Sequence, residues 1–151
     1  MVREYFDDCG IGEHAVTPAR TVTESDVVWF AGLTGDWNPI HTDKELASRS
    51  EFGGRIAHGM LILALGTGLI TRIPLGGFLP KSLIAVVGID RVRLVKPVMI
   101  GDTIHVECEM LEAKSMTGGK GLLEVRFRII NQAGETVQTG RWKCLAGRRS
   151  E

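Results

Sequence analysis

The segment from Met60 to Thr71 limits the possible folds of this chain more than any other stretch. It is apolar at nearly every position, with Met60 followed by Leu61, Ile62, Leu63, Ala64, Leu65, Leu69 and Ile70. As a helix it would have no polar face, and such helices are buried on nearly all sides. It is also shorter than the roughly 20 residues that a bilayer-spanning helix needs. We therefore expect a central helix that the rest of the chain surrounds.

Gly66 and Gly68 interrupt this predicted helix. Glycine costs roughly 1 kcal/mol relative to alanine inside a helix, so some benefit must offset that cost. The benefit that we expect is the close approach of a second element, most simply tight packing against a sheet.

Alternating apolar and polar residues after Lys81 predict a series of long strands. A change of phase near Gly88 in the first of them indicates a β-bulge. The predicted inward residues of the two middle strands are Ile104, Val106, Cys108 and Met110, and Leu123, Val125, Phe127 and Ile129. We expect strands at Ser82–Lys96, Thr103–Lys114, Leu122–Ile130 and Glu135–Ala146, with a hairpin turn at Asn131–Gly134.

Before residue 60 the predicted elements are short. Thr23 is a typical N-cap for a helix over Glu24–Thr34, and Gly35 is placed to end that helix. Asp43 can cap a second helix over Lys44–Ser50.

The remaining segments are predicted to be edges and connections. Ala15–Val22 favours an edge strand, because Pro18 cannot donate to a neighbouring strand. Residues 1–14 are expected to form a loosely ordered lead-in, Phe52–Arg55 a flexible connection, and Gly147–Glu151 a frayed tail.

One apolar helix followed by a meander of strands predicts a single α+β domain over residues 1–151, with its core at about 15–146. The antiparallel sheet should curl around the long central helix. A single sheet leaves the far side of the helix and one sheet edge open, so we expect a homodimer or a larger homo-oligomer.

The charge balance limits the partners that we expect, and the cysteine content limits the compartment. The chain has 18 Lys and Arg residues against 18 Asp and Glu residues, which gives no electrostatic reason to expect nucleic acid or an anionic membrane. Three widely separated cysteines, Cys9, Cys108 and Cys144, do not suggest a disulfide framework. The acidic start of the chain does not resemble a signal peptide. These features predict a cytoplasmic protein.

The main candidates for chemistry lie in two short stretches. The first is Gly35-Asp36-Trp37-Asn38-Pro39-Ile40-His41, and the second is Ala57-His58-Gly59-Met60. Because the residue before a proline is pushed out of the helical region, we expect a folded loop that points Asp36 and His41 at one place. A carboxylate and an imidazole that share a water molecule can move a proton at neutral pH.

The same stretches resemble the hydratase-2 motif of the MaoC-like, (R)-specific enoyl-CoA hydratases, which have the hotdog fold. The resemblance extends over about Thr17 to Ala146 and includes Lys96-Pro97-Val98 and Gly101-Asp102. It implies a homodimeric or larger hotdog assembly. It also implies a substrate, an acyl-CoA or acyl-carrier-protein thioester, that lies in a tunnel beside the central helix. No cofactor is expected, since coenzyme A would be part of the substrate.

The resemblance implies roles for individual residues. Asp36 and His41 match the catalytic pair that adds water to a trans-2-enoyl thioester, or removes it from the (R)-3-hydroxyacyl product. Gly59 matches the position whose backbone N–H receives the thioester oxygen, and Asn38 the asparagine that braces the catalytic loop. Asn38, His58 and Met60 are the residues expected to bind the substrate.

Three further positions near this motif bear on the site. His58 is expected to hold the loop or the helix start beside the substrate, and Met60 is expected to contact the substrate. Ala64 stands where many relatives have a serine, which leaves site polarity and substrate preference open.

Three other readings remain open. Asp36, His41, Asp43 and His58 could bind a metal, but no familiar zinc-ligand spacing accompanies them, so we expect no metal site. A hotdog acyl-CoA thioesterase would share the architecture and not the complete loop motif. A non-catalytic acyl-CoA-binding module would keep the tunnel without turnover. Nucleophilic catalysis is disfavoured, because no G-x-S-x-G motif occurs and Cys108 and Cys144 are expected to be buried.

Overall fold

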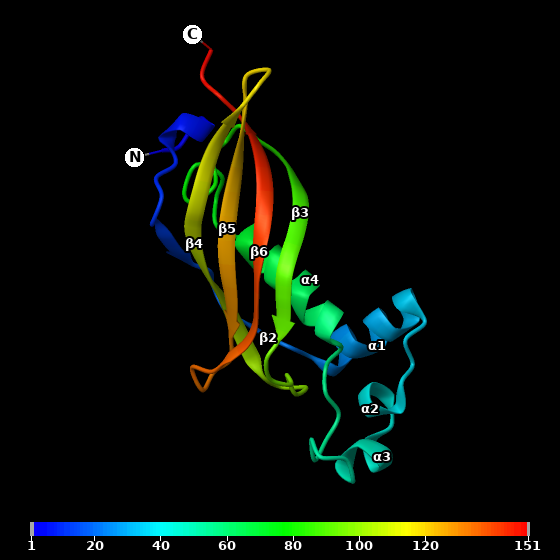
Figure 1. The fold of residues 1–151 in the computed structure, drawn as a ribbon. Coiled ribbons are helices and arrows are strands. Elements are labelled where there is room, and N and C mark those ends of the chain that lie inside the picture. The colour runs from blue at the N-terminus through cyan, green and yellow to red at the C-terminus, as the bar shows by residue number, and fades with distance from the viewer. Residues whose placement is uncertain (1, 151) are drawn as a thin grey trace.

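One antiparallel sheet and one helix packed against it make up most of the molecule (Figure 1). The computed structural model describes residues 2–150. Its helices are the 3-10 turn η1 Phe6–Asp8, α1 Glu24–Thr34, α2 Pro39–Thr42, α3 Lys44–Ser48 and α4 Gly59–Ile70. Its strands are β1 His14–Val16, β2 Arg20–Thr21, β3 Leu83–Leu94, β4 Thr103–Met116, β5 Lys120–Ile130 and β6 Thr136–Gly147.

The sheet runs in the order β1-β4-β5-β6-β3, with β2 paired to β4. β4, β5, β6 and β3 are joined by antiparallel pairing, as the alternating pattern predicted. All eight predicted inward residues of β4 and β5 are buried and belong to the hydrophobic core. The predicted bulge near Gly88 is confirmed by a register shift between Val86 and Gly88.

α4 lies against the curved sheet and begins one residue before the predicted start. Gly66 is where the helix comes closest to the sheet: a Cβ there would lie 2.6 Å from Cδ1 of the fully buried Ile129. The expected close approach is confirmed at this glycine. Nothing lies within 4 Å of such a Cβ at Gly68, among the residues that the structure describes.

The prediction that this helix is buried on all sides is wrong for the single chain. Met60, Ala64 and Gly68 are exposed. These residues are four positions apart, so they form one stripe along the helix. The sheet covers the opposite face only, which leaves an apolar stripe that runs from the start of the helix toward its end.

Two further predictions need correction, both because of proline. Ala15–Val22 forms two short strands, β1 and β2, with Pro18 in the break between them. The stretch after Asp36 is not all loop, because Pro39–Thr42 forms the single helical turn α2. Proline is well tolerated at the first position of a helix, where its missing N–H would have no partner.

The two ends of the chain are ordered against each other. Phe6 is buried and packs on Gly121, where a Cβ would lie within 2.3 Å of the phenyl ring. Asp7 and Asp8 form ion pairs with Arg148 and Arg149 respectively. The predicted loose lead-in and frayed tail are therefore wrong over these residues. Met1 and Glu151, which those two predictions also covered, lie outside the described residues. Within residues 2–150, no helix has the length and apolarity that crossing a bilayer requires.

The close approach at Gly66 gives a stability prediction. Gly66→Ala should lower the free energy of unfolding by roughly 1–2 kcal/mol, because overpacking a rigid core outweighs the better helix propensity of alanine. Gly32→Ala is the matched control, since among the described residues the Trp37 ring, at 3.9 Å, is the one neighbour that its Cβ would have within 4 Å. Urea unfolding should rank Gly66→Ala below the wild type and Gly32→Ala at or above it. Equal stability of the two variants would contradict the tight contact.

The three cysteines give a second prediction. They are unpaired, and burial raises the pKa of the Cys108 thiol to about 12 and those of the Cys9 and Cys144 thiols to about 11. The reactive thiolate is therefore scarce at pH 8. A colorimetric disulfide reagent should react slowly with the folded protein, at Cys9 first because it is the least buried, and rapidly with all three thiols in urea. Fast labelling of Cys108 or Cys144 in the folded state would contradict this packing.

Candidate active site

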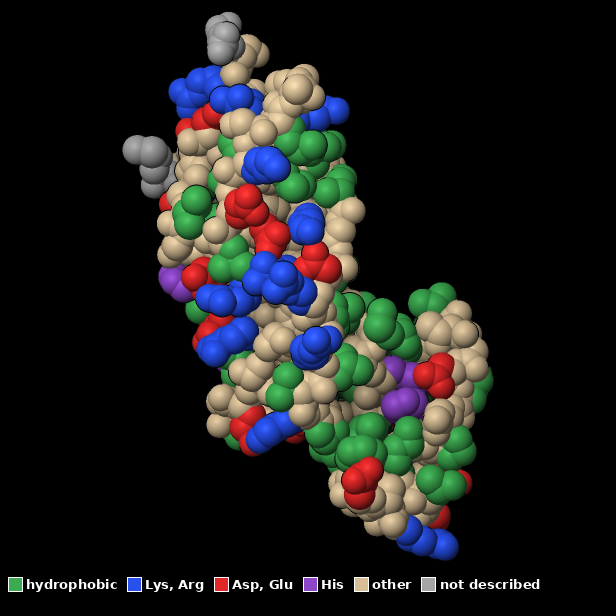
Figure 2. All heavy atoms as spheres, in the orientation of Figure 1, with side chains coloured by type: hydrophobic (Ala, Val, Ile, Leu, Met, Phe, Trp, Pro, Cys, Tyr) green, Lys and Arg blue, Asp and Glu red, His purple; other side chains and the backbone are tan. Residues whose placement is uncertain are grey.

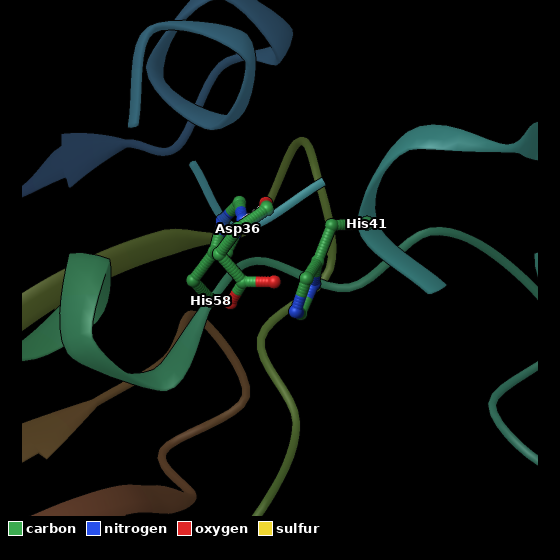
Figure 3. A group of neighbouring side chains, drawn as sticks. All are labelled: Asp36, His41 and His58. Carbon is green, nitrogen blue, oxygen red and sulfur yellow. Dashed lines mark hydrogen bonds between the residues drawn. The ribbon is translucent and has the colours of Figure 1, made fainter. Parts of the chain in front are cut away.

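The structure brings Asp36, His41 and His58 together, although they come from a loop, from α2 and from the start of α4. A carboxylate oxygen and one nitrogen from each ring all lie within 4.8 Å of one another. Figure 3 shows the Asp36 carboxylate and the His41 ring turned toward each other. Asp36 is exposed, while His41 is 9% and His58 is 2% exposed.

Local turns place the carboxylate. α1 ends at Gly35, whose positive φ of 78° reverses the chain, a conformation that glycine adopts without steric cost. The Thr34 hydroxyl then accepts from the Asp36 N–H, and the Asp36 carboxylate accepts from the Asn38 N–H, both at 3.3 Å. Asn38 in turn caps α2 by accepting from the Ile40 N–H.

His41 is oriented by backbone carbonyls. Its Nδ1 lies 2.7 Å from the Ile56 carbonyl oxygen. A carbonyl only accepts, so Nδ1 carries the hydrogen and Nε2 is the nitrogen left for chemistry. The carbonyl of His41 itself accepts from Nε of Arg55 at 2.7 Å, and the same guanidinium pairs with Glu24 on α1.

His58 connects the start of α4 to the loop that carries Asp36. Its Nε2 donates to the Asp36 carbonyl oxygen at 2.9 Å. Its ring stacks on His41 with a centroid distance of 3.8 Å and lies 4.9 Å from the ring centroid of Phe30. Nδ1 of His58 is buried and has no hydrogen-bond partner within residues 2–150. These contacts agree with the expected holding role of His58.

The three side chains line one cavity of about 430 Å³. Its other walls are Phe30, Thr34, Gly59, Met60 and Leu94. Figure 2 shows histidine side chains in a hollow bordered by hydrophobic side chains and one acidic group. The hollow therefore has a polar end and apolar walls, which suits a ligand with one reactive polar group on an apolar chain.

Gly59 is the first residue of α4 and lies at the polar end of the cavity. The first N–H groups of a helix have no partner within the helix, and the helix dipole favours negative charge beside them. A Cβ at Gly59 would lie 2.6 Å from Cδ1 of Leu94. The absent side chain thus makes room for Leu94.

Not every predicted site residue reaches the cavity. Met60 lines it and is 61% exposed. Asn38 caps α2 and is not part of the cavity wall, so a direct substrate contact by Asn38 stays a prediction. Ala64 lies on the exposed stripe of α4 and is also outside this wall.

Sequence reasoning missed three residues that touch this site. Arg55 holds the His41 carbonyl from a segment expected to be flexible. Leu94 packs against Gly59, and Gln138 donates a hydrogen bond to the Gly59 carbonyl. Only Gln138 carried a signal, as a polar residue at an inward position of an alternating strand.

Asp36, His41 and His58 are also the group of potential metal ligands that the described residues place within 4.8 Å. One nitrogen of each imidazole is held by a backbone carbonyl, which leaves one nitrogen per ring and the carboxylate to bind an ion. The expectation that no metal binds stays a prediction.

Comparison with known proteins identifies the family that this chain matches. The family described as "MaoC like domain" matches residues 8–133. The protein named MaoC from Klebsiella aerogenes is 40% identical over 104 residues, which are 69% of this chain and 30% of that protein. A 3-hydroxybutyryl-CoA dehydratase from Methylorubrum extorquens is 38% identical over 109 residues, 72% of this chain and 64% of that enzyme. The chain thus spans less than two thirds of the length of these two relatives.

Solved structures agree with the family match. The X-ray structure of a monoamine oxidase regulatory protein from Archaeoglobus fulgidus superposes with a TM-score of 0.91 at 38% identity, over 98% of this chain and 97% of that one. A Mycobacterium tuberculosis protein with a double hotdog fold matches 99% of this chain and 46% of its own length, at a TM-score of 0.82 and 19% identity, which shows the fold alone. The chain therefore belongs to the MaoC-like dehydratase family and has the hotdog fold, an α+β architecture in which a curled antiparallel sheet packs on a central helix.

Proposed function

We propose that this protein hydrates trans-2-enoyl thioesters to (R)-3-hydroxyacyl thioesters, or catalyses the reverse dehydration, with an acyl-CoA or an acyl-carrier-protein thioester as substrate. The observation that carries the proposal is the meeting of the Asp36 carboxylate and the His41 imidazole within 4.8 Å, in the same cavity as the start of α4. The relative named 3-hydroxybutyryl-CoA dehydratase supports this reaction class.

The protons balance across the pair. Asp36 as a carboxylate takes a proton from the water whose oxygen attacks C3. His41 enters the step as the imidazolium, with one hydrogen on Nδ1 that the Ile56 carbonyl accepts and one on Nε2, and gives the Nε2 proton to C2. The C2–C3 double bond becomes a single bond, and the product gains one hydroxyl and one hydrogen. Asp36 then returns its proton to His41, which restores both groups. A positioned acid and base of this kind contribute about a hundredfold to ten-thousandfold to a rate.

Negative charge that develops on the thioester oxygen needs a donor. The N–H of Gly59 lies at the first turn of α4, where residues 2–150 offer it neither a helical acceptor nor a side-chain cap. Removing one such donor from an oxyanion site typically costs about 3 kcal/mol in the transition state. The apolar walls of the cavity would hold the acyl chain while this polar end holds the thioester.

The two alternatives with the same architecture predict different products. A thioesterase would release free thiol, and it would leave the paired Asp36 and His41 without a defined use. A binding module would retain acyl-CoA without turnover. Ala64, where many relatives have a serine, lies outside the cavity wall and therefore does not favour the binding module.

Asp36→Asn tests the proposal directly. The wild type should remove the enoyl absorbance of crotonyl-CoA, and Asp36→Asn should lower kcat by roughly a hundredfold or more, because the amide cannot take up the proton. Asp43→Asn makes the same change seven residues away, at the N-cap of α3, where asparagine caps equally well. It should keep wild-type turnover. Chiral analysis of the product tests the (R) configuration, and a folded wild type that leaves enoyl thioesters unchanged would refute the function.

We also infer a homodimer, built on surfaces that the single chain leaves open. β3 is an end strand of the sheet, and Ile84, Val86, Val87 and Ile89 on it are exposed. An exposed apolar edge strand invites pairing with another strand. This edge and the exposed stripe of α4 both reach the cavity, through Leu94 and Met60 respectively. A second copy placed here would cover the open side of the cavity.

Val87→Glu should break this assembly. Val87 is 56% exposed on β3, so the charge does little to the isolated chain but opposes apolar pairing at the edge. Light scattering after gel filtration should give about twice 16.5 kDa for the wild type and 16.5 kDa for the variant. Val16→Glu, on β1 at the opposite end of the sheet and 62% exposed, is the matched control and should remain dimeric. A monomeric wild type would refute the dimer.

A further inference from the structure

Gln138 places a polar side chain at a position of β6 where its neighbours in the same alternation are apolar or small. Every second residue of the strand from Gln138 onward is buried, and the others in this series are Gly140, Trp142, Cys144 and Ala146. Gln138 itself is 2% exposed. Burying an amide is unfavourable unless hydrogen bonds replace its contacts with water, so the partner that it does have is informative.

That partner is the first residue of α4. Nε2 of Gln138 donates to the carbonyl oxygen of Gly59 at 2.7 Å, across 79 positions of sequence. Since a carbonyl only accepts, the orientation of the amide is fixed, with its NH₂ group toward the helix. Its Oε1 is buried and has no hydrogen-bond partner among residues 2–150.

The residue opposite Gln138 contacts the same glycine. Leu94 and Gln138 are direct cross-strand partners in the β3–β6 pair. Leu94 fills the space where a Gly59 side chain would be, while Gln138 holds the Gly59 carbonyl. One residue pair of the sheet thus fixes the start of α4 by one hydrogen bond and one van der Waals contact.

The residue before Gly59 is fixed from the other side. Nε2 of His58 donates to the Asp36 carbonyl, and the His58 ring stacks on His41. Any rotation of the first turn of α4 would therefore move Gly59 and His58 together, and with them the alignment of the catalytic loop.

We propose that Gln138 is a positioning residue for the reaction, one that sets the orientation of the first turn of α4 so that the Gly59 N–H meets the thioester oxygen. This inference rests on the proposed hydratase function. The position of the Gly59 N–H matters because an oxyanion donor acts only within about 3 Å of the developing charge. Gln138 contributes by holding the Gly59 carbonyl and is not itself a catalytic residue.

Gln138→Leu removes the hydrogen bond at similar size. It should lower kcat roughly ten- to a hundredfold, because a displacement of about 1 Å at a reacting group can cost that much. KM should change little, since the Gly59 N–H that this variant misaligns acts mainly in the transition state. A purely structural role would instead lower the thermal midpoint and leave kcat per folded molecule unchanged.

Gln138→Glu tests the hydrogen bond through the pH dependence of kcat, which a change in packing alone would not alter. The protonated acid can donate to the Gly59 carbonyl, and the carboxylate cannot. The ratio of variant kcat to wild-type kcat should therefore fall as pH rises through the pKa of the new carboxyl, which burial raises. Lys96, which pairs with Glu135, is the charged side chain of the cavity wall that Gln138 shares, and it opposes this rise. Asp36, His41 and His58 near the same helix start are present in both proteins, so the ratio removes any pH dependence that the two proteins share.

Gln132→Glu is the matched control, because it makes the same change in the exposed turn between β5 and β6. The ratio of its kcat to wild-type kcat should not change with pH. Circular dichroism establishes folding of each variant at each pH, and Gln138→Met replaces Gln138→Leu if the latter does not fold. Wild-type kcat in the leucine or methionine variant, or a flat ratio for Gln138→Glu, overturns the inference.

Hydrogen exchange separates this inference from the function on which it rests. Peptides that contain the first turn of α4 should exchange faster in Gln138→Leu than in the wild type, whether or not turnover is measured. A wild type without activity on enoyl thioesters refutes the proposed function, and the exchange data then decide alone whether Gln138 holds the turn. Unchanged exchange there counts against the inference in either case.

Discussion

The packing of α4 on the inner face of the sheet is the contact on which the rest of the structure depends. At Gly66 the helix backbone approaches the buried Ile129 side chain so closely that a single methyl group would not fit without displacement. This contact sets the depth of the helix, and its position along the sheet places Gly59 beside Leu94 and Gln138. The loop that carries Asp36 then needs only to reach the exposed start of the same helix.

Main-chain atoms, more than other side chains, orient the groups at that helix start. His41 and His58 each donate to a backbone carbonyl, and the Asp36 carboxylate accepts from a backbone N–H. The carboxylate is therefore not occupied in aligning an imidazole, as it is in a Ser-His-Asp triad. It remains free to act on a water molecule. The geometry of the pair is consequently a property of the fold, and it persists without a ligand.

Much of this arrangement could be predicted from the sequence because it depends on local rules. Alternation identified the inward residues of β4 and β5, and the caps at Thr23 and Asp43 and the glycine end of α1 were predicted at the residues where they occur. The meeting of Asp36 and His41 was predicted from the motif. The helical turn α2 was not predicted. The rule that keeps the residue before a proline out of a helix applies to Asn38, whereas Pro39 itself is suited to the first position of a helix.

What could not be predicted depends on contacts between distant segments. The strand register that sets Leu94 opposite Gln138 has no local signal, and neither does the hydrogen bond from Arg55 to the His41 carbonyl. Burial of α4 was overestimated for the same reason: an apolar face indicates that something covers it, and does not show whether the cover belongs to the same chain.

The ion pairs between Asp7 and Arg148 and between Asp8 and Arg149 join the two ends of the chain at one pole of the molecule. Figure 1 shows the N and C labels at the end of the sheet opposite α1 and α2, whose residues Phe30, Thr34 and His41 line the cavity. An affinity tag or a fused domain attached at either terminus would therefore leave from the pole remote from the cavity mouth. The architecture can thus be built into longer polypeptides without obstructing the entry of a ligand.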